Sequence, residues 1–355
     1  LERAGDLDVA TVQEINRAAA RSTWPLRVVF QEIEQQKARQ GVGGSSIREQ
    51  LAAKGLVSGL PLADVARERP LEPREEQALL PVEPLAALLD AHGPLATAFP
   101  GYEHRPEQIE MLRAVARAFN ERQHLIVEAG TGVGKSLAYL IPALAFAMRN
   151  GRRVVVSTNT ITLQDQLFNK DVPDLARILG GRPGSPSPLG PGEMRVVTLK
   201  GRSNYLCTRR WNTFRAADHR APEELRLLAR VMIWLPTTLT GDRSELTIPT
   251  AAENALWSRI AADSEGCNPE TCQAFQRGQC FFYRARRQAE AAHLIIANHA
   301  LILSDIATEN HLIPEYHHLI IDEAHDLEEA ATSQLGYETD QAAVYALLEQ
   351  LSGSA

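Results

Sequence analysis

The sequence predicts an α/β protein whose parallel sheet is interrupted by a mostly helical insert and preceded by a helical segment. Three observations support this fold class. From residue 101 onward, short β-rich runs alternate with helical stretches, and a glycine-rich turn joins one such run to an amphipathic helix. All four cysteines fall within residues 200–290, which lack this alternation.

Residues 1–100 contain helical patterns separated by loops. The run "LDVATVQEINRAAARS" has helical spacing, "RQGVGGSS" is a flexible break, and "RPLEPREEQALLPVEP" is a Pro/Glu-rich connector. This third of the chain has no cluster of chemically active residues. We therefore interpret it as a helical linker or lobe.

The α/β domain is expected over residues 101–199 and 291–330. Its strands are predicted at five short apolar runs, "HLIVEAG", "RRVVVSTNT", "MRVVTLKG", "AHLIIANHA" and "HHLIIDEAH". Runs of this length and composition suit a parallel sheet that is covered on both faces. The stretch "LGGRPGSPSPLGPG", residues 179–192, is expected to be a surface loop.

The stretch "VEAGTGVGKSLAYL" is typical of a phosphate-binding loop between a strand and a helix. Its glycines allow backbone N–H groups to converge on phosphate oxygens, and the helix N-terminus adds partial positive charge. Lys135 would reach the terminal phosphates, and the Ser136 hydroxyl would bind Mg²⁺. The motif usually begins with glycine, whereas here it begins with alanine. The predicted loop consists of Ala129, Gly130, Thr131, Gly132, Val133, Gly134, Lys135 and Ser136.

A pair of carboxylates follows the last predicted strand, in "LIIDEAHD". We expect Asp322 to hold Mg²⁺ and Glu323 to accept a proton from an attacking water. The two motifs together predict ATP hydrolysis by in-line attack of water. Upstream, "HRPEQIEMLRAV" contains Arg105 and Gln108, and the amide could read an adenine edge. The alternative for these two residues is an ordinary surface helix start.

Composition limits the other functions. The longest apolar runs are too short for a membrane helix, and the chain shows no secretory leader, so we expect a cytoplasmic protein. The net charge is −7, yet residues 200–290 carry 14 Lys/Arg and 10 Asp/Glu, which makes this region +4 and the remainder −11. The cysteine region is thus basic within an acidic protein.

The cysteines follow the spacing Cys207-x59-Cys267-x4-Cys272-x7-Cys280. Structural zinc sites commonly use two tight pairs, whereas here one cysteine lies far from the other three. Four thiolates without paired histidines also suit an iron–sulfur cluster. Spacing alone leaves a cluster, a zinc site and unrelated buried thiols open.

Cationic and aromatic residues flank the cysteines in "RRWNTFR" and "FFYRARR". Such pairs occur in single-strand binders, where Arg209, Arg210, Arg284, Arg286 and Arg287 would contact nucleic acid. The alternative is an amphipathic helix that buries its rings and exposes its arginines to water.

The motifs resemble those of superfamily 2 helicases. "AGTGVGKS" and "DEAH" are similar to motifs I and II, "RPEQ" to the Q motif, and "STNTITLQDQL" to motif Ia. The "YLC" followed by C-x4-C-x7-C and "YRARRQAEAAHLIIANHALIL" resembles the DinG/XPD branch of iron–sulfur DNA helicases. The resemblance covers about residues 100–330 and implies a RecA-like P-loop domain that binds ATP and Mg²⁺.

The same resemblance implies a 4Fe-4S cluster on Cys207, Cys267, Cys272 and Cys280. It also implies DNA contacts by motif Ia, at Thr158, Thr160 and Gln164, with single-stranded or forked DNA as the partner and 5′ to 3′ polarity. Such a helicase would act in DNA repair or replication in the bacterial cytosol. Motifs III to VI of a second motor domain are not in this sequence, so we expect an N-terminal portion that does not unwind DNA alone.

Two segments at the ends carry weaker expectations. Residues 1–60 resemble the part that follows an exonuclease domain in some DinG-like proteins, and residues 331–355 could begin a further helical domain. Two other functions remain open at this point. One is a nucleotide-switched DNA-binding module, and the other is a zinc-stabilised P-loop ATPase that acts on RNA or protein.

Overall fold

The computed structural model describes residues 4–39 (except 6), 70–180 (except 100 and 131), 187–263 (except 218 and 219), 267, 270 and 272–336 (except 277 and 309–311). The chain divides into two compact units. The first, which we call the insert unit, contains residues 1–70 and 200–291; the second, the sheet unit, contains residues 71–199 and 292–355. The N-terminal hundred residues are thus shared between the two units.

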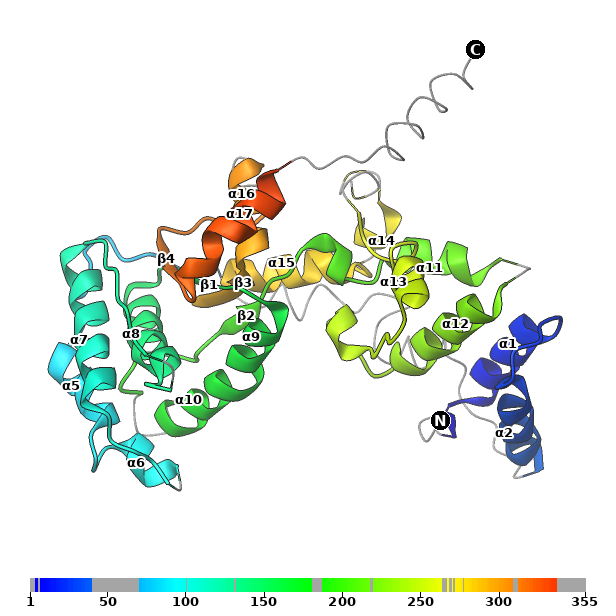
Figure 1. The fold of residues 1–355 in the computed structure, drawn as a ribbon, viewed down its shortest axis with the longest axis horizontal. Coiled ribbons are helices and arrows are strands. Elements are labelled where there is room, and N and C mark those ends of the chain that lie inside the picture. The colour runs from blue at the N-terminus through cyan, green and yellow to red at the C-terminus, as the bar shows by residue number, and fades with distance from the viewer. Residues whose placement is uncertain are drawn as a thin grey trace, which may run out of the picture. The chain divides into compact units, whose positions relative to one another are not determined.

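The sheet unit is built on one parallel sheet of four strands in the order β2-β3-β1-β4 (Figure 1). The strands are β1 (Val154–Thr158), β2 (Val196–Thr198), β3 (Leu294–Asn298) and β4 (His318–Ile321). Val154 of β1 pairs with Leu294 on one side and His318 on the other. Four of the five predicted strands are therefore confirmed, and so is the α/β class with a parallel sheet.

Helices of the sheet unit supply most of its core. Its helical elements are α5 (Val82–Ala86), η2 (Ala87–Leu89), α6 (Pro94–Ala98), α7 (Pro106–Glu121), α8 (Lys135–Asn150), α9 (Ile161–Gln166), the π-helical η3 (Leu167–Asp171), α10 (Val172–Leu179), α16 (His299–Ala307), η6 (Ala324–Asp326) and α17 (Leu327–Leu335). Helices α7 and α8 lie side by side (Figure 1). Helix α8 is apolar around most of its circumference and contributes a long buried run to the same core as β1 and β3.

The fifth predicted strand, at residues 124–130, is wrong. Within the described chain this segment pairs with no strand, and its apolar side chains are exposed, with Ile126 97% accessible. Its composition suits a buried strand, but burial also requires hydrogen-bonding neighbours, and none of the described strands provides them.

The strand that carries the acidic motif is also less buried than predicted. All five residues of β1 are buried, whereas in β4 Leu319 is exposed and the other three residues are half-buried. The reason is that β4 pairs only with β1 among the described strands and lies at the sheet edge. The acidic motif therefore follows a partly exposed edge strand.

The insert unit is mostly helical, as predicted. Its elements are α1 (Val9–Ala19), α2 (Arg27–Arg39), η4 (Arg202–Asn204), α11 (Thr208–Arg215), α12 (Pro222–Trp234), η5 (Arg243–Glu245), α13 (Ala251–Trp257), α14 (Gln273–Gln276) and α15 (Phe281–Ala291). The predicted flexible break at residues 40–46 lies outside the described residues.

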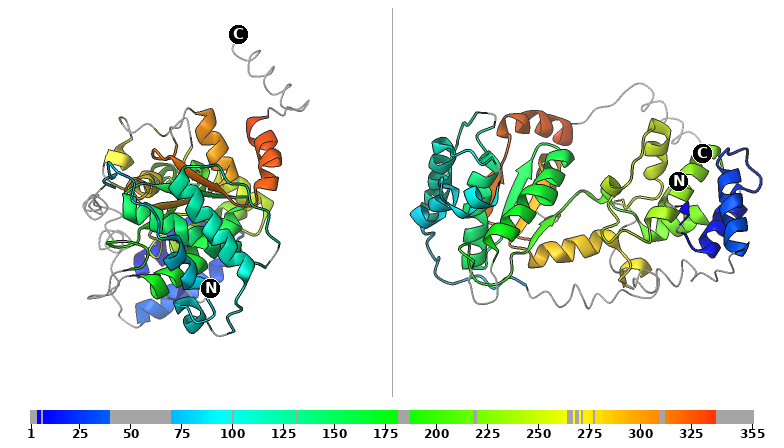
Figure 2. Two further views of the ribbon diagram at one scale, coloured as in Figure 1. Left: turned by 90° about the vertical axis from the view of Figure 1, so that its left-hand side faces the viewer. Right: turned by 90° about the horizontal axis from the view of Figure 1, so that it is seen from below.

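The N-terminal helices belong to the core of the insert unit. Asp8 caps α1 by accepting a 2.9 Å hydrogen bond from the Thr11 N–H, and Val12 and Ile15 face the core. Helices α1 and α2, drawn in blue in Figures 1 and 2, pack on each other, and α1 also packs on α12. Trp24 and Phe30 stack with ring centroids 5.6 Å apart inside this shared core. Side chains between Ala4 and Phe30 thus contribute to the core of the cysteine-bearing unit.

No helix in the described parts of the chain is long and apolar enough to cross a membrane.

Candidate nucleotide site and cysteine cluster

The glycine-rich loop connects the exposed segment 124–128 to the N-terminus of α8. Gly132 and Gly134 have φ of +82° and +85°, a backbone conformation that side chains with a Cβ rarely adopt. The predicted residue Thr131 lies outside the described part of the loop. Helix α8 begins at Lys135, so the predicted phosphate contacts fall at a helix N-terminus.

Arg105 and Gln108 contact the backbone of this loop. The Gln108 amide donates a 2.8 Å hydrogen bond to the Gly134 carbonyl, and the Arg105 guanidinium donates to the Gly132 carbonyl. Gln108 is buried, and a Cβ on Gly134 would lie only 2.2 Å from its amide nitrogen. Gln108, which was predicted to read an adenine edge, therefore also supports the glycine-rich loop through this hydrogen bond. The absence of a side chain at Gly134 leaves space for the Gln108 amide.

The two acidic-motif carboxylates lie beside the loop lysine. The Lys135 ammonium forms a 2.9 Å ion pair with the Glu323 carboxylate, although 188 positions separate them in the chain. Both side chains are about one quarter exposed. Glu323 has a left-handed backbone with φ of +54°, which is uncommon for a residue with a side chain and is often found at functional sites.

Asp322 is held by a residue that the sequence did not single out. The Tyr139 hydroxyl donates a 3.1 Å hydrogen bond to the Asp322 carboxylate, and the Asp322 N–H donates to the Ser157 carbonyl at 2.8 Å. Burial raises the pKa of Asp322, the hydrogen bond from Tyr139 lowers it, and the charge of Glu323 raises it. Tyr139 lies one helical turn after Lys135. A hydroxyl-bearing side chain within an otherwise apolar helical run is the sequence signal that could have identified it.

A buried histidine, His299, lies close to the acidic motif. The imidazole Nδ1 of His299 is 2.7 Å from the Ser157 hydroxyl, and its Nε2 has no hydrogen-bond partner among the described residues. Burial lowers the pKa of His299, while backbone groups of Glu323 and Asp322 raise it. Sequence reasoning missed His299, which follows directly after β3 in "ANHA".

Ser136 also has an unpredicted neighbour, because the π-helical turn η3 brings Asp171 to the start of α8. Burial raises the pKa of Asp171, and a hydrogen bond with Ser136 lowers it. Single π turns often occur at functional sites. The loop, the acidic motif and η3 together form one polar site at the N-terminus of α8.

The four cysteines come together in the insert unit as free thiols. Burial, together with the charges of the other three cysteines, raises the pKa of the Cys280 thiol to about 11, which indicates that the four thiols lie near one another. Cys207 is buried, and the other three are half-buried. Burial also raises the pKa of Cys267, whereas the nearby Arg202 guanidinium lowers it.

The donor types limit which metal centre these thiols could hold. Among the described residues, no group of three or more His, Cys, Asp or Glu side chains is placed to hold a metal ion. A zinc ion with Zn–S bonds of about 2.3 Å needs four sulfurs converging on one point. A cluster places each cysteine on its own iron, so the thiols can lie further apart. Four thiols without a histidine suit the chemistry of a cluster, and the donor types alone also admit zinc.

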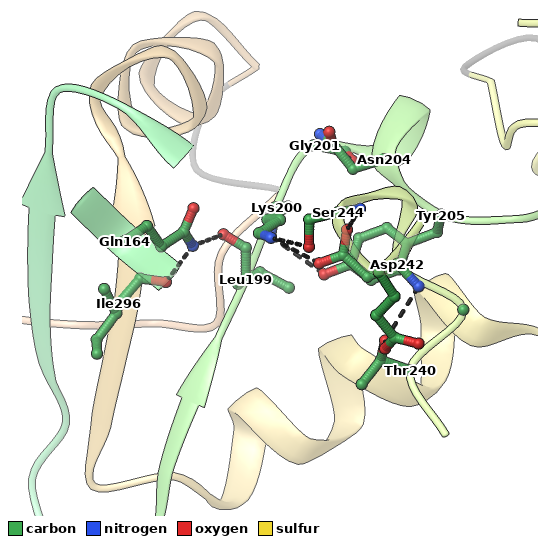
Figure 3. Close-up of polar contacts among 12 residues, drawn as sticks. Gln164, Leu199, Lys200, Gly201, Asn204, Tyr205, Thr240, Asp242, Ser244 and Ile296 are labelled. Carbon is green, nitrogen blue, oxygen red and sulfur yellow. Dashed lines mark hydrogen bonds and ion pairs between the residues drawn. The ribbon is translucent and has the colours of Figure 1, made fainter. Parts of the chain in front are cut away.

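The predicted motif Ia contacts are engaged within the sheet unit. The Thr158 hydroxyl is buried and donates to the Thr160 carbonyl, and Thr160 caps α9. The Gln164 amide is fully buried and bridges two carbonyls, of Leu199 at 3.0 Å and Ile296 at 2.7 Å (Figure 3). Gln164 thus joins the residue that follows β2 to the middle of β3. Thr160 is the most accessible of the predicted three.

Two of the five predicted DNA-contacting arginines hold the insert unit together. Arg210 donates to the carbonyl of Ala261 at 3.2 Å and also pairs with Asp263. Arg284 lies over the Phe281 ring at 4.8 Å and donates to the Leu239 carbonyl, and burial lowers its pKa. The remaining arginines, Arg209, Arg286 and Arg287, are exposed or half-buried.

The parallel sheet, the glycine-rich loop and the DEAH carboxylates beside it define a DEAD/DEAH-box helicase domain. The family model for DEAD/DEAH box helicases matches residues 105–172, and the DEAD_2 model matches residues 268–344.

Comparison with similar proteins identifies one family within the DEAD/DEAH-box helicases. The chain is 39% identical over 253 residues to the ATP-dependent helicase DinG of Mycobacterium tuberculosis, a match that covers 67% of this chain and 37% of that protein. It is 34% identical to the 3′-5′ exonuclease DinG of Bacillus subtilis, covering 68% of this chain and 24% of that protein. It is 35% identical to the ATP-dependent DNA helicase YoaA of Escherichia coli, covering 69% and 36%. The chain is a DinG-like helicase sequence, and the matched part spans about a quarter to just over a third of these relatives.

Proposed function

We propose that this chain is the N-terminal motor portion of an ATP-dependent DNA helicase. The observation that carries the proposal is the 2.9 Å ion pair between Lys135 and Glu323, because it brings the phosphate-binding loop and the acidic motif into one site. The name of the Escherichia coli relative, an ATP-dependent DNA helicase, supports DNA as the substrate. A helicase that acts on bacterial DNA would work in the cytoplasm. The resemblance further supports 5′ to 3′ translocation on single-stranded or forked DNA.

In the proposed reaction, the phosphates of ATP bind Lys135 and the N-terminus of α8, and Glu323 is released from its ion pair. The oxygen of a water attacks the γ-phosphorus, the bond to the β-phosphate oxygen breaks, and Glu323 takes the proton of the water. Ser136 and Asp322 would hold Mg²⁺, which neutralises the charge of the phosphates. Tyr139 keeps the Asp322 carboxylate oriented toward this position.

We propose that Cys207, Cys267, Cys272 and Cys280 hold a 4Fe-4S cluster. Their shared neighbourhood and their thiol-only donor set support this assignment. The cluster would link segments of the insert unit that are far apart in the sequence and so stabilise its fold.

For DNA contacts we retain Thr160, Arg209, Arg286 and Arg287. The proposal no longer includes Thr158, Gln164, Arg210 and Arg284, because their side chains are engaged in contacts within their own units. The basic charge of residues 200–290 supports binding of the DNA backbone by this region.

Isothermal titration of the chain with Mg²⁺–ATP tests the nucleotide site. We expect saturable binding that Lys135→Ala weakens at least tenfold, because the lysine supplies the charge that meets the terminal phosphates. Arg149→Ala, at the opposite end of α8, is the matched control and should bind like the wild type. Equal binding by Lys135→Ala and the wild type would exclude this site.

A further inference from the structure

Lys200 is a lysine whose side chain is almost completely buried, with 1% of its surface exposed. Its ammonium lies 2.7 Å from the Asp242 carboxylate and 3.0 Å from the Ser244 hydroxyl (Figure 3). Burial of a charge is costly, and a buried ion pair is weak evidence for stability alone. The best-attested role of such a buried pair is to favour one arrangement of the chain over the alternatives.

The pair fixes the segment that leads into Cys207. Tyr205 and Asp242 form an antiparallel bridge, and the Leu206 N–H donates to the Gly241 carbonyl at 2.9 Å. The Lys200 N–H also donates to the Tyr205 hydroxyl at 3.1 Å, so the lysine contacts both sides of the bridge. Cys207 is therefore two residues from a bridge that the ion pair stabilises.

On their other side, residues 205–207 pair with residues 260–262, which precede Cys267 in the sequence. The Cys207 N–H donates to the Ile260 carbonyl, and the Ala262 N–H donates to the Tyr205 carbonyl, both at 2.9 Å. Residues 205–207 thus form the middle of three short extended segments, and the third, residues 260–262, ends five positions before Cys267 in the sequence.

The start of α15, next to Cys280, rests on Gly241. Gly241 has φ of +67°, and a Cβ at this position would lie 2.2 Å from the ring of Phe281. Phe281 is 1% exposed and directly follows Cys280. Gly241 and Asp242 therefore contact the segments of two cysteines and, through residues 205–207, the segment of a third.

We infer that the Lys200–Asp242 ion pair is a positioning element for the cysteine cluster, which sets the spacing between Cys207, Cys267 and Cys280. This inference rests on the cluster proposed above. A neutral side chain at position 200 would leave the Asp242 carboxylate without its cation, and the Tyr205–Asp242 bridge would lose the charge that holds it in register.

The test uses the full chain, purified without exposure to oxygen, and measures iron and sulfide per chain, visible circular dichroism and the far-ultraviolet melting temperature. We expect Lys200→Met and Asp242→Asn to lower iron per chain at least threefold, with an altered visible spectrum for the cluster that remains. Asp242→Asn keeps the shape of the side chain and supplies a folded variant if Lys200→Met does not fold.

The matched control is Arg230→Met, which breaks the ion pair of Arg230 with the fully buried Glu253 in the same unit. This variant should melt at a lower temperature while its iron content and visible spectrum stay unchanged. Wild-type iron content and spectrum in both Lys200→Met and Asp242→Asn would overturn the inference. So would a loss of iron in Arg230→Met that matches theirs at an equal drop in melting temperature. A wild-type chain without iron and sulfide would instead refute the cluster itself.

Discussion

Replacing Glu323 with glutamine should tighten ATP binding while strongly slowing hydrolysis. The Lys135–Glu323 pair, 2.9 Å long and about one quarter exposed on each side, must break before Lys135 can bind phosphate. Pairs of this exposure contribute about 1 kcal/mol. Because Glu323→Gln removes this competing interaction, the dissociation constant should fall about fivefold. Loss of the general base should slow hydrolysis by about 10²-fold or more.

The assay is calorimetric titration of both proteins with Mg²⁺ and a non-hydrolysable ATP analogue, at one salt concentration. Glu328→Gln, an exposed carboxylate in the first turn of α17, is the control and should bind like the wild type. A folded Glu323→Gln protein that binds the analogue no more tightly than the wild type would refute the reasoning from the ion pair.

Three further outcomes are expected. Phe30→Ala should lower the melting temperature of the insert unit by roughly 10 °C, because it empties a buried position worth about 3–5 kcal/mol, while the exposed Val28→Ala should not. Burial and nearby Arg152 lower the pKa of His318 to about 4, so its contribution to stability is present above pH 6.5 and lost as the pH falls toward 4. Acid melts of His318→Phe should therefore show less destabilisation between these values, whereas melts of the exposed His92→Gln should follow the wild type. Arg287→Ala should reduce the salt dependence of single-strand binding by about one unit of the logarithmic slope, and an unchanged slope would argue for its ring contact with Phe275 alone.

Much of the fold could be predicted because apolar periodicity and turn chemistry act locally. The strands that became β1 to β4 are short apolar runs beside recognisable loops, and each found a parallel neighbour. Residues 124–130 have the same composition but no partner among the described strands, and pairing depends on residues far away in the sequence. The packing of Trp24 and Phe30 could not be predicted for the same reason, because the core that they join is formed mainly by residues beyond 200.

The residues of the candidate site could be predicted from their types and motifs, but the residues that they contact could not. Lys135 and Glu323 belong to recognisable motifs, yet their ion pair exists only because the fold closes a separation of 188 residues. Gln108 and Gln164 were predicted from their motifs to meet ligands, and the structure adds that both amides bind backbone carbonyls within the sheet unit. An amide in a motif has the same chemistry in either role, so only its surroundings distinguish them.

ATP hydrolysis at the nucleotide site is proposed to drive movement along DNA. The decisive measurement is the rate of ATP hydrolysis by the longer protein containing this chain, with and without single-stranded DNA. DNA should raise the rate at least tenfold, and Lys135→Ala should abolish it. A rate that does not respond to DNA, or that survives Lys135→Ala, would contradict this proposal.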